Sequence, residues 1–397
     1  MLTYRRYITK FSWLPVIGML LIFGLSACTK GKREADIKDL YFPPVVDLNE
    51  GDSTFNYIFR QRFEGYSCFR IPALIRTQNG TILAFAEGRK NSCSDTGDID
   101  LVMKKSTDNG KTWGPLIKVW DDAKNTCGNP APVLDEETGV VHLLLTWNLG
   151  TDDIGDINNG TSTDTRRVYV MTTSDNGDNW SAPKEITSSV KRPEWGWYAT
   201  GPCHGIQVKG GPKDGRLVIP CDYIEKGAGR RGYSHVIYSD DHGANWQIGG
   251  ISPLPQANES AVAQLSDGSL MLNMRHSGAS RYVATSTDYG ESWTNMYLDT
   301  RLVEPVCQGS LLSFPSGGKH HLFFSNPANT TRTKMTIRYS ENDAATWSKS
   351  YLVYEGSSAY SDLIKISDDE VGILFEGGKT SPYTGISFKV VPLSEFN

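Results

Sequence analysis

Arg70 stands inside an otherwise apolar segment, Cys68-Phe-Arg-Ile-Pro-Ala-Leu74, which is expected to form a buried strand. A guanidinium removed from water needs a carboxylate partner or an anionic ligand, because an unpaired buried charge is costly. The arginine therefore leaves two interpretations open. It belongs either to a structural ion pair or to a site that binds an anion.

An acidic segment with Asp95, Asp98 and Asp100 follows and could supply a general acid or a calcium loop. Gly97 occupies the third position of such a loop and no glutamate stands at the twelfth, so the calcium interpretation is not favoured. The sequence also has no C-x-x-C pair, H-E-x-x-H, G-x-S-x-G or phosphate loop. We therefore expect no metal site and no cofactor.

The charge balance limits the kind of anion that can bind. The 397 residues contain 40 Lys and Arg against 45 Asp and Glu, which gives a net charge of −5. This balance provides no basic field for nucleic acid. A small anionic ligand would have to be held by a local cluster of cations.

An octapeptide ending in tryptophan occurs five times. The copies begin at Ser106, Thr173, Ser239, Ser286 and Ser340. The first four have Asp at the third position and Gly at the fifth, and the last copy has lost both. Asp can cap backbone N–H groups, Gly permits positive φ, and Trp can pack the turn onto a sheet. We expect these aspartates to be structural rather than catalytic.

The spacing of the octapeptides predicts the architecture. Each copy follows a short alternating run typical of a strand, and successive copies lie 47 to 67 residues apart. A mean period of about 58 residues divides residues 51–397 into about six units. We predict an all-β fold over residues 51–397, a six-bladed β-propeller of four-stranded antiparallel sheets. Functional residues would then project onto the central axis from scattered positions in the sequence.

The N-terminal residues are typical of an export signal. Basic residues precede the apolar stretch Phe11–Leu25, which is short for a bilayer span. Leu25-Ser-Ala-Cys28 resembles the lipobox of bacterial lipoproteins, although Cys28 could follow an ordinary signal peptide by chance. We expect residues 1–27 to be a lipoprotein signal peptide, Cys28 to be lipidated and residues 28–50 to be a tether. The protein would be exported and membrane-anchored, on the periplasmic or the cell-surface side.

Six further cysteines could form disulfides in an oxidising compartment, but the sequence does not select their pairing.

Phe69-Arg-Ile-Pro72, followed by the octapeptides, resembles the bacterial exo-α-sialidase (neuraminidase) family, with FRIP motif and Asp boxes. The resemblance extends from about residue 55 to the end of the chain and implies a six-bladed propeller. In this family three arginines hold the carboxylate of the sugar. They look like Arg70, Arg275 and Arg332, with Arg338 as an alternative to the third. Such a cluster would let an acidic protein bind a small anion.

The resemblance also implies the catalytic residues. The acid/base looks like Asp95, with Asp98 as its nearest alternative, and Arg89 is implied as a further substrate-binding residue. Glu259 in Asn258-Glu-Ser-Ala matches the catalytic glutamate, and Tyr360 matches the nucleophile. Glu376 matches the glutamate that orients the first arginine.

A tyrosine suits this chemistry because the anomeric carbon of sialic acid carries its own carboxylate. A carboxylate nucleophile would be repelled there, whereas a neutral phenol would not. A phenol with an ordinary pKa near 10 needs a base, and Glu259 can take its proton. The aromatic segment 195–202 and the segment 127–132 are expected to shape the pocket or to pack in the core.

We therefore expect a monomeric exo-α-sialidase that hydrolyses terminal α-linked sialic acids of glycoproteins, glycolipids or oligosaccharides with retention. Two alternatives stay open. The protein could be a trans-sialidase or an anhydro-forming sialidase, or a non-catalytic propeller that only binds sialic acid. The sequence does not decide linkage preference or tolerance of O-acetylation.

Overall fold

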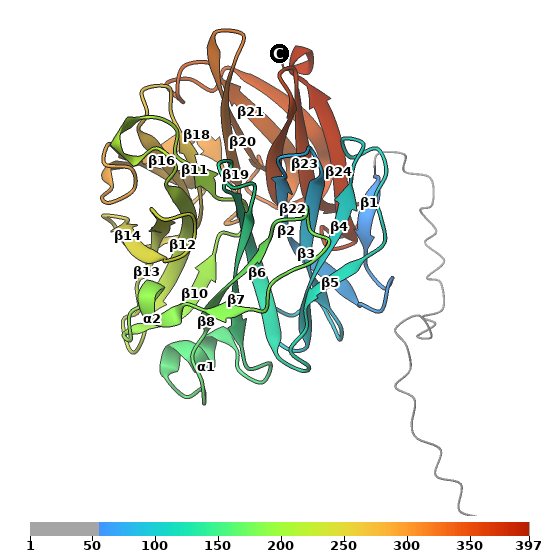
Figure 1. Cartoon of the computed structure of the whole chain (residues 1–397), viewed down its shortest axis with the longest axis vertical. Coiled ribbons are helices and arrows are strands. Elements are labelled where there is room, and N and C mark those ends of the chain that lie inside the picture. The colour runs from blue at the N-terminus through green and yellow to red at the C-terminus, as the bar shows by residue number, and fades with distance from the viewer. Residues whose placement is uncertain (1–54, 397) are drawn as a thin grey trace, which may run out of the picture.

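The computed structural model describes residues 55–396, and the expected signal peptide, lipidated Cys28 and tether lie outside this range. Strands dominate, which confirms the all-β class (Figure 1). Helical segments of the described chain are α1 (Ile154–Asn159), α2 (Thr187–Val190) and the 3-10 turns Gly211–Lys213 and Leu393–Glu395. No helix between residues 55 and 396 is long and apolar enough to cross a membrane.

The strands form four hydrogen-bonded sheets. The first contains β2 (Cys68–Arg76), β3 (Ile82–Arg89), β4 (Ile99–Ser106), β5 (Ile117–Trp120), β6 (Thr126–Leu134), β7 (Val141–Asn148), β8 (Arg167–Thr173) and β9 (Lys184–Glu185). The second contains β10 (Trp195–Thr200), β11 (Ile206–Gln207), β12 (Leu217–Glu225), β13 (Gly232–Ser239) and β14 (Gln247–Ile251).

The two remaining sheets complete the fold. The third contains β15 (Ala257–Gln264), β16 (Leu270–His276), β17 (Ser280–Ser286) and β18 (Thr294–Val303). The fourth contains β19 (Ser310–Ser316), β20 (Lys319–Pro327), β21 (Thr333–Ser340), β22 (Lys349–Ser367), β23 (Glu370–Gly378), β24 (Gly385–Pro392) and β1 (Tyr57–Arg60).

Neighbouring strands pair antiparallel, and two features join larger groups. In the first sheet, the single parallel pair Ile99–Thr126 links β4 to β6. In the fourth, the 19-residue strand β22 pairs with β21 along its first half and with β23 along its second. Strand β1 pairs with β24, so the first described strand closes the sheet of the last.

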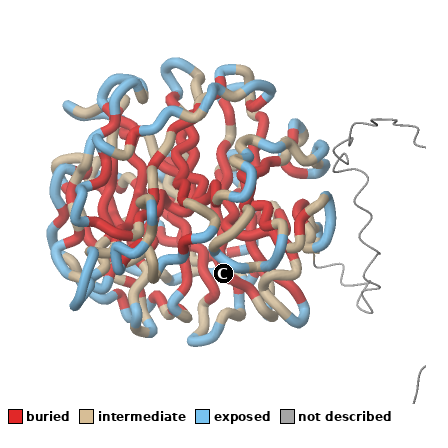
Figure 2. The backbone as a smooth tube through the Cα atoms, turned by 90° about the horizontal axis from the view of Figure 1, so that it is seen from below, coloured by how far each residue is buried: buried red, intermediate tan, exposed pale blue. Residues whose placement is uncertain are grey.

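Contacts between the groups of strands are made by the inner strands, which are β2, β6, β10, β12, β15, β19 and β22. Strand β2 contacts β6 and β22, β6 contacts β10 and β12, β12 contacts β15, β15 contacts β19, and β19 contacts β22. These contacts close a ring, so residues from distant parts of the sequence meet at the ends of the inner strands. Buried residues fill the interior and exposed residues lie on the surrounding loops (Figure 2).

The octapeptides are turns, as predicted. In the first, Asp108 Oδ1 accepts hydrogen bonds from Ser106 Oγ at 2.8 Å and from the Thr112 backbone N–H at 2.9 Å. Gly110 has φ of 83°, which favours glycine at this position. The other copies repeat these bonds, including the one with Asn342 in place of Asp. The aspartates therefore accept hydrogen bonds from the turns in which they stand.

Among the described cysteines, Cys68 and Cys93 form a disulfide. The others are free and buried: Cys127, Cys203, Cys221 and Cys307. The bond lies in the first sheet, where it joins the start of β2 to the loop between β3 and β4.

Candidate active site

Three predicted site residues, Arg70, Glu259 and Tyr360, lie on inner strands, close to irregularities in strand pairing. The register shifts between Arg70 and Ala73 in β2, between Ala257 and Ser260 in β15, and between Ser358 and Ser361 in β22. Strands β6 and β10 have similar shifts at Gly128–Ala131 and Trp195–Tyr198. A bulge bends a strand and re-aims its side chains, which is why bulges are frequent beside active sites.

Tyr360, Glu259 and Arg275 form a hydrogen-bonded cluster. The Tyr360 hydroxyl donates to Glu259 Oε1 at 2.5 Å. Arg275 Nη1 donates to Glu259 Oε2 at 2.7 Å and to the Tyr360 hydroxyl at 3.0 Å. Burial, assisted by the Glu259 carboxylate, raises the pKa of Tyr360 well above its usual value despite the nearby arginines. The phenol is therefore neutral and has a base directly beside it.

The two other predicted arginines also face Tyr360. The guanidinium carbon of Arg70 lies 5.1 Å from the centre of the Tyr360 ring, and that of Arg332 lies 5.7 Å from it. Arg332 donates to the Tyr383 hydroxyl at 2.9 Å and to the Val306 carbonyl. Within residues 55–396 it makes no ion pair with a carboxylate, so its charge is free to meet an anion.

Glu376 holds Arg70 and the backbone around it. Its Oε1 accepts from Arg70 Nε at 2.7 Å and from the Ile71 N–H at 2.9 Å, while Oε2 accepts from the Tyr360 N–H at 3.2 Å. Ile71 lies in the bulge with φ of 61°, a conformation that is strained for a β-branched residue. The fully buried Glu376 thus fixes the bulge that presents Arg70. It is the carboxylate partner that a buried arginine needs.

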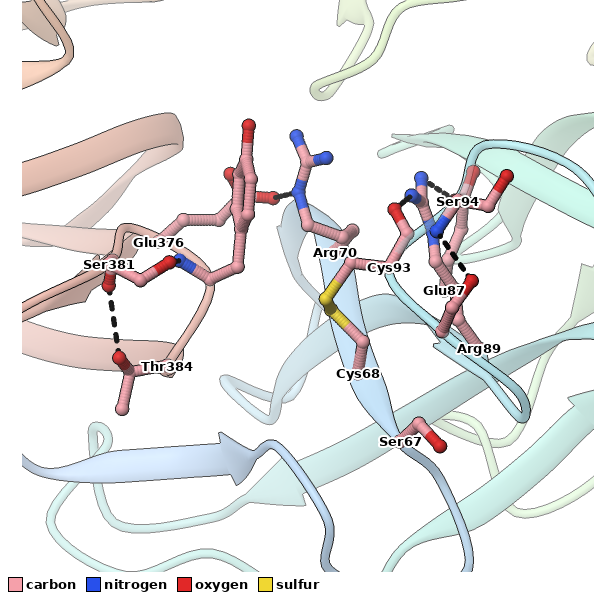
Figure 3. The surroundings of a disulfide bond; sticks show 12 residues. Ser67, Cys68, Arg70, Glu87, Arg89, Cys93, Ser94, Glu376, Ser381 and Thr384 are labelled. Carbon is pink, nitrogen blue, oxygen red and sulfur yellow. Dashed lines mark hydrogen bonds and ion pairs between the residues drawn. A yellow bond between two sulfur atoms is a disulfide. The ribbon is translucent and has the colours of Figure 1, made fainter. Parts of the chain in front are cut away.

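Asp95 approaches from the loop between β3 and β4. Its carboxylate lies 2.8 Å from Arg89 Nη1 and 3.9 Å from Arg70 Nη1. Arg89 is itself held by Glu87, which accepts from both Nε and Nη2 (Figure 3). Partial desolvation by neighbouring protein atoms opposes ionisation of Asp95, but the charges of Arg89 and Arg70 outweigh it and lower the pKa of the carboxyl. The side chain remains 74% exposed.

The two sequence alternatives lie elsewhere. Asp98 pairs with Lys90 at 2.9 Å, at the base of the loop rather than at Arg70. Arg338 donates to Asn326 at 3.1 Å, and no contact joins it to Tyr360 in the described structure. The geometry therefore favours Asp95 over Asp98 and Arg332 over Arg338.

Tyr383 is a site residue that the sequence did not reveal. Its ring lies 4.2 Å from the guanidinium carbon of Arg70, and its hydroxyl accepts from Arg332. One tyrosine thus touches two of the three arginines. It stands in the loop Ser381-Pro-Tyr-Thr384 after β23, and no motif or spacing marks it.

The aromatic segment in β10 reaches the same end of the ring. Arg166, fully buried, stacks on Trp197 with 3.8 Å between the guanidinium carbon and the ring centre. It donates to Asn129 and Asn148, and to the Tyr198 carbonyl at 2.7 Å. Trp195 and Tyr198 are buried in the core, whereas Trp197 is partly exposed. Only part of the segment can therefore line a pocket.

A cavity of about 1200 Å³ opens at the other end of the inner strands. Its lining includes Leu74, Leu265 and Leu363, which follow the site residues along β2, after β15 and along β22. Asp362 lies between the two ends and accepts hydrogen bonds from Leu74 N–H, His204 and Ser310. The cavity is therefore separate from the Tyr360 cluster. No group of three or more metal-ligating side chains occurs among residues 55–396.

The chain resembles known proteins over most of its length. A family model described as "BNR repeat-like domain" matches residues 80–373. A sialidase of Bacteroides fragilis is 33% identical over 83% of this chain and 63% of that protein, so the chain spans less than two thirds of it. An exo-alpha-sialidase of Arthroderma benhamiae is 33% identical over 79% of this chain and 78% of that protein. The structure of Hadza microbial sialidase Hz136 matches with a TM-score of 0.76 and 34% identity, over 83% of this chain and 67% of that one.

Proposed function

Because this chain belongs to the sialidase family, we propose that it is an exo-α-sialidase, which releases terminal α-linked sialic acids from glycoproteins, glycolipids or oligosaccharides with retention. One observation carries the proposal. Arg70, Arg275 and Arg332 surround a neutral tyrosine that is hydrogen-bonded to a carboxylate. A cluster of arginines binds a carboxylate, and a tyrosine beside a base attacks a carbon next to that carboxylate.

The arginines divide the task of binding the sugar carboxylate. Arg70 and Arg275 are already paired with Glu376 and Glu259, so they are held in place before substrate arrives. Arg332 has only neutral partners among the described residues and supplies the uncompensated charge. Two oriented guanidiniums and one free charge favour a carboxylate over a neutral sugar at this position.

The first chemical step forms a covalent intermediate on Tyr360. The phenol oxygen bonds to the anomeric carbon while its proton passes to Glu259, and the bond to the leaving oxygen breaks. Asp95 donates a proton to that oxygen. In the second step water, deprotonated by Asp95, displaces the phenol oxygen, and Glu259 returns the proton to Tyr360. Two displacements at one carbon give net retention.

A non-catalytic sialic-acid-binding propeller is the alternative of another class. Such a protein needs the arginines, but it has no use for a phenol held 2.5 Å from a carboxylate. A trans-sialidase or an anhydro-forming enzyme would use the same residues and differ in the acceptor that attacks the intermediate. Hydrolysis is the reaction that the relatives named sialidase favour.

The pairing of strands supports a six-bladed propeller over residues 51–397. Splitting the first sheet at the Ile99–Thr126 pair and the fourth within β22 gives six groups of about four strands, in agreement with the octapeptide period. For the N-terminus, the lipobox-like Leu25-Ser-Ala-Cys28 supports export and anchoring to a bacterial membrane by lipid on Cys28, with residues 28–50 as the tether.

The proposal is tested with a fluorogenic aryl sialoside and with sialyllactose. The wild-type protein is expected to release free sialic acid from both, and mass spectrometry identifies the product as the hydrolysed, transferred or anhydro sugar. If NMR showed the β-anomer as the first product formed, before mutarotation, the reaction would be inverting, which would contradict the Tyr360 intermediate. Binding of sialic acid without release from either substrate would favour the non-catalytic propeller.

A further inference from the structure

The loop that carries Asp95 has little packing of its own. Residues Asn91, Ser92, Ser94 and Asp95 are exposed, and hydrogen bonds such as Ser94 N–H to Ser92 Oγ stay within the loop. Its base is better held, since the Lys90 N–H donates to the Asp98 carbonyl and Ser67 Oγ donates to the Lys90 carbonyl. The position of the loop tip must therefore be fixed by specific bonds between the loop and the rest of the protein.

The Cys68–Cys93 disulfide is the covalent attachment. Cys68 is buried in β2, two residues before Arg70, and Cys93 stands two residues before Asp95. The bond thus joins the strand that presents the carboxylate-binding arginine to the loop that presents the expected acid. Figure 3 shows the bond with Arg70 and Arg89 near it.

Arg89 connects the disulfide to the carboxylate. The same Nη1 donates to the Cys93 carbonyl at 2.6 Å and lies 2.8 Å from Asp95 Oδ1. Glu87 fixes the guanidinium from its other side, and both residues are buried in β3. The ion pair alone is weak support, because an exposed carboxylate gains little from pairing in water. With Cys93 held by the bond, its carbonyl stays on Arg89 and Asp95 stays within reach.

We propose that Cys68 and Cys93 are positioning residues for Asp95, and that opening their disulfide selectively impairs the step that needs the acid. This inference rests on the proposed sialidase activity. A dithiol reductant supplies the two electrons and two protons: the S–S bond breaks, two thiols form, and the reductant becomes a cyclic disulfide. Tyr360, Glu259, Arg275 and Arg332 lie on other elements and keep their contacts, and Glu376 still holds Arg70.

The leaving group distinguishes this role from general damage. An alkyl oxygen, as in sialyllactose, needs protonation as it departs, whereas a good aryl leaving group needs almost none. Wild-type protein is assayed with both substrates before and after treatment with dithiothreitol, beside Cys93→Ser. The kcat/KM, which reports the first step, is expected to fall about tenfold or more on sialyllactose and less than about threefold on the aryl sialoside.

Two controls complete the experiment. Ser94→Ala changes the neighbouring loop residue and is expected to keep wild-type kinetics and its response to reductant. Cys93→Ser is expected to be insensitive to dithiothreitol, which would assign the effect to this bond. Equal losses on both substrates would overturn the proposal, as would full activity of the reduced protein on sialyllactose.

Hydrogen exchange gives a readout independent of activity. After reduction, amides of residues 91–97 are expected to exchange faster while those around Glu259 and Tyr360 stay protected. Unchanged exchange of the loop would overturn the positioning role. If the oxidised wild type released nothing from either substrate, the sialidase proposal would fail instead, and the exchange result would still show whether the bond holds the loop.

Discussion

The two halves of the site are built in opposite ways. Tyr360 and Glu259 lie on inner strands and Glu376 lies on the adjacent strand β23. Each is at most 8% exposed, and hydrogen bonds link them to Arg275 and Arg70. Asp95 stands on a loop with its side chain 74% exposed, and the loop is attached through Arg89 and a disulfide. The nucleophile half is thus fixed by the core and the acid half by a local cross-link.

The difference matches what each half must do. The nucleophile and its base must meet one carbon beside one carboxylate, so strands and bulges can fix them rigidly. The acid must reach a leaving oxygen on glycans of varied shape, which favours a position at the edge of the site. Substitutions in the two halves should therefore differ in their dependence on the leaving group.

Tyr360→Phe is expected to give the largest effect. It removes the attacking oxygen while keeping the ring between Arg70 and Arg332, so kcat should fall about 10³-fold on aryl and alkyl sialosides alike. Steady-state kinetics on both substrates check this, with binding of free sialic acid as the control for an intact arginine cluster. A variant with wild-type kcat would exclude Tyr360 as the nucleophile.

Asp95→Asn should separate the two substrates. Loss of general acid catalysis is expected to lower kcat/KM, which reports the first step, about 10²-fold on sialyllactose and far less on an aryl sialoside. Asp98→Asn, at the base of the same loop, is the matched control and should keep the substrate ratio. An equal effect of Asp95→Asn on both substrates would show that Asp95 is not the general acid.

The structure also predicts how the acid half responds to pH. The charges of Arg89 and Arg70 lower the pKa of Asp95 in the free protein. A bound sugar carboxylate neutralises Arg70, so the pKa of Asp95 should rise in the complex. The acid works in its protonated form, kcat/KM reports the free protein and kcat reports the complex. The alkaline limb of the pH profile should therefore lie at higher pH for kcat than for kcat/KM. Coinciding limbs on sialyllactose would contradict this assignment.

Local patterns in the sequence predicted much of the fold. The octapeptides encode their turns within eight residues, since Asp108 bonds to Ser106 and Thr112. The site residues beyond Arg70 were suggested by the family resemblance. A residue such as Glu259 has no local signal of its function, because its partner Tyr360 is 101 residues away.

Other features could not be predicted because they depend on packing. The bulge at Ile71 is fixed by Glu376, which lies 305 residues along the chain. The Cys68–Cys93 pairing depends on how the β3–β4 loop folds back onto β2, and six cysteines left it open. Tyr383 acts through contacts with two arginines that only the closed ring brings together.

Arg332→Ala tests the one arginine of the cluster that lacks a carboxylate partner among the described residues. A charge-assisted hydrogen bond to a carboxylate contributes about 1.5–3 kcal/mol, so KM should rise roughly 10- to 100-fold on either substrate. Arg338→Ala removes a guanidinium six residues away and should leave KM unchanged. An unchanged KM for Arg332→Ala would contradict its place in the carboxylate site.

Tyr383→Phe should have the smallest effect and bears on how rigid the nucleophile half is. The change keeps the ring beside Arg70 and removes only the hydroxyl that accepts from Arg332. One such hydrogen bond contributes about 0.5–1.5 kcal/mol, which corresponds to a roughly two- to tenfold rise in KM with kcat nearly unchanged. Tyr351→Phe, which removes a hydroxyl that accepts from Lys389 in the same sheet, is the matched control. A fall in kcat with KM unchanged would mean that Tyr383 acts on Tyr360 in the transition state, and that the arginines do not hold their positions independently.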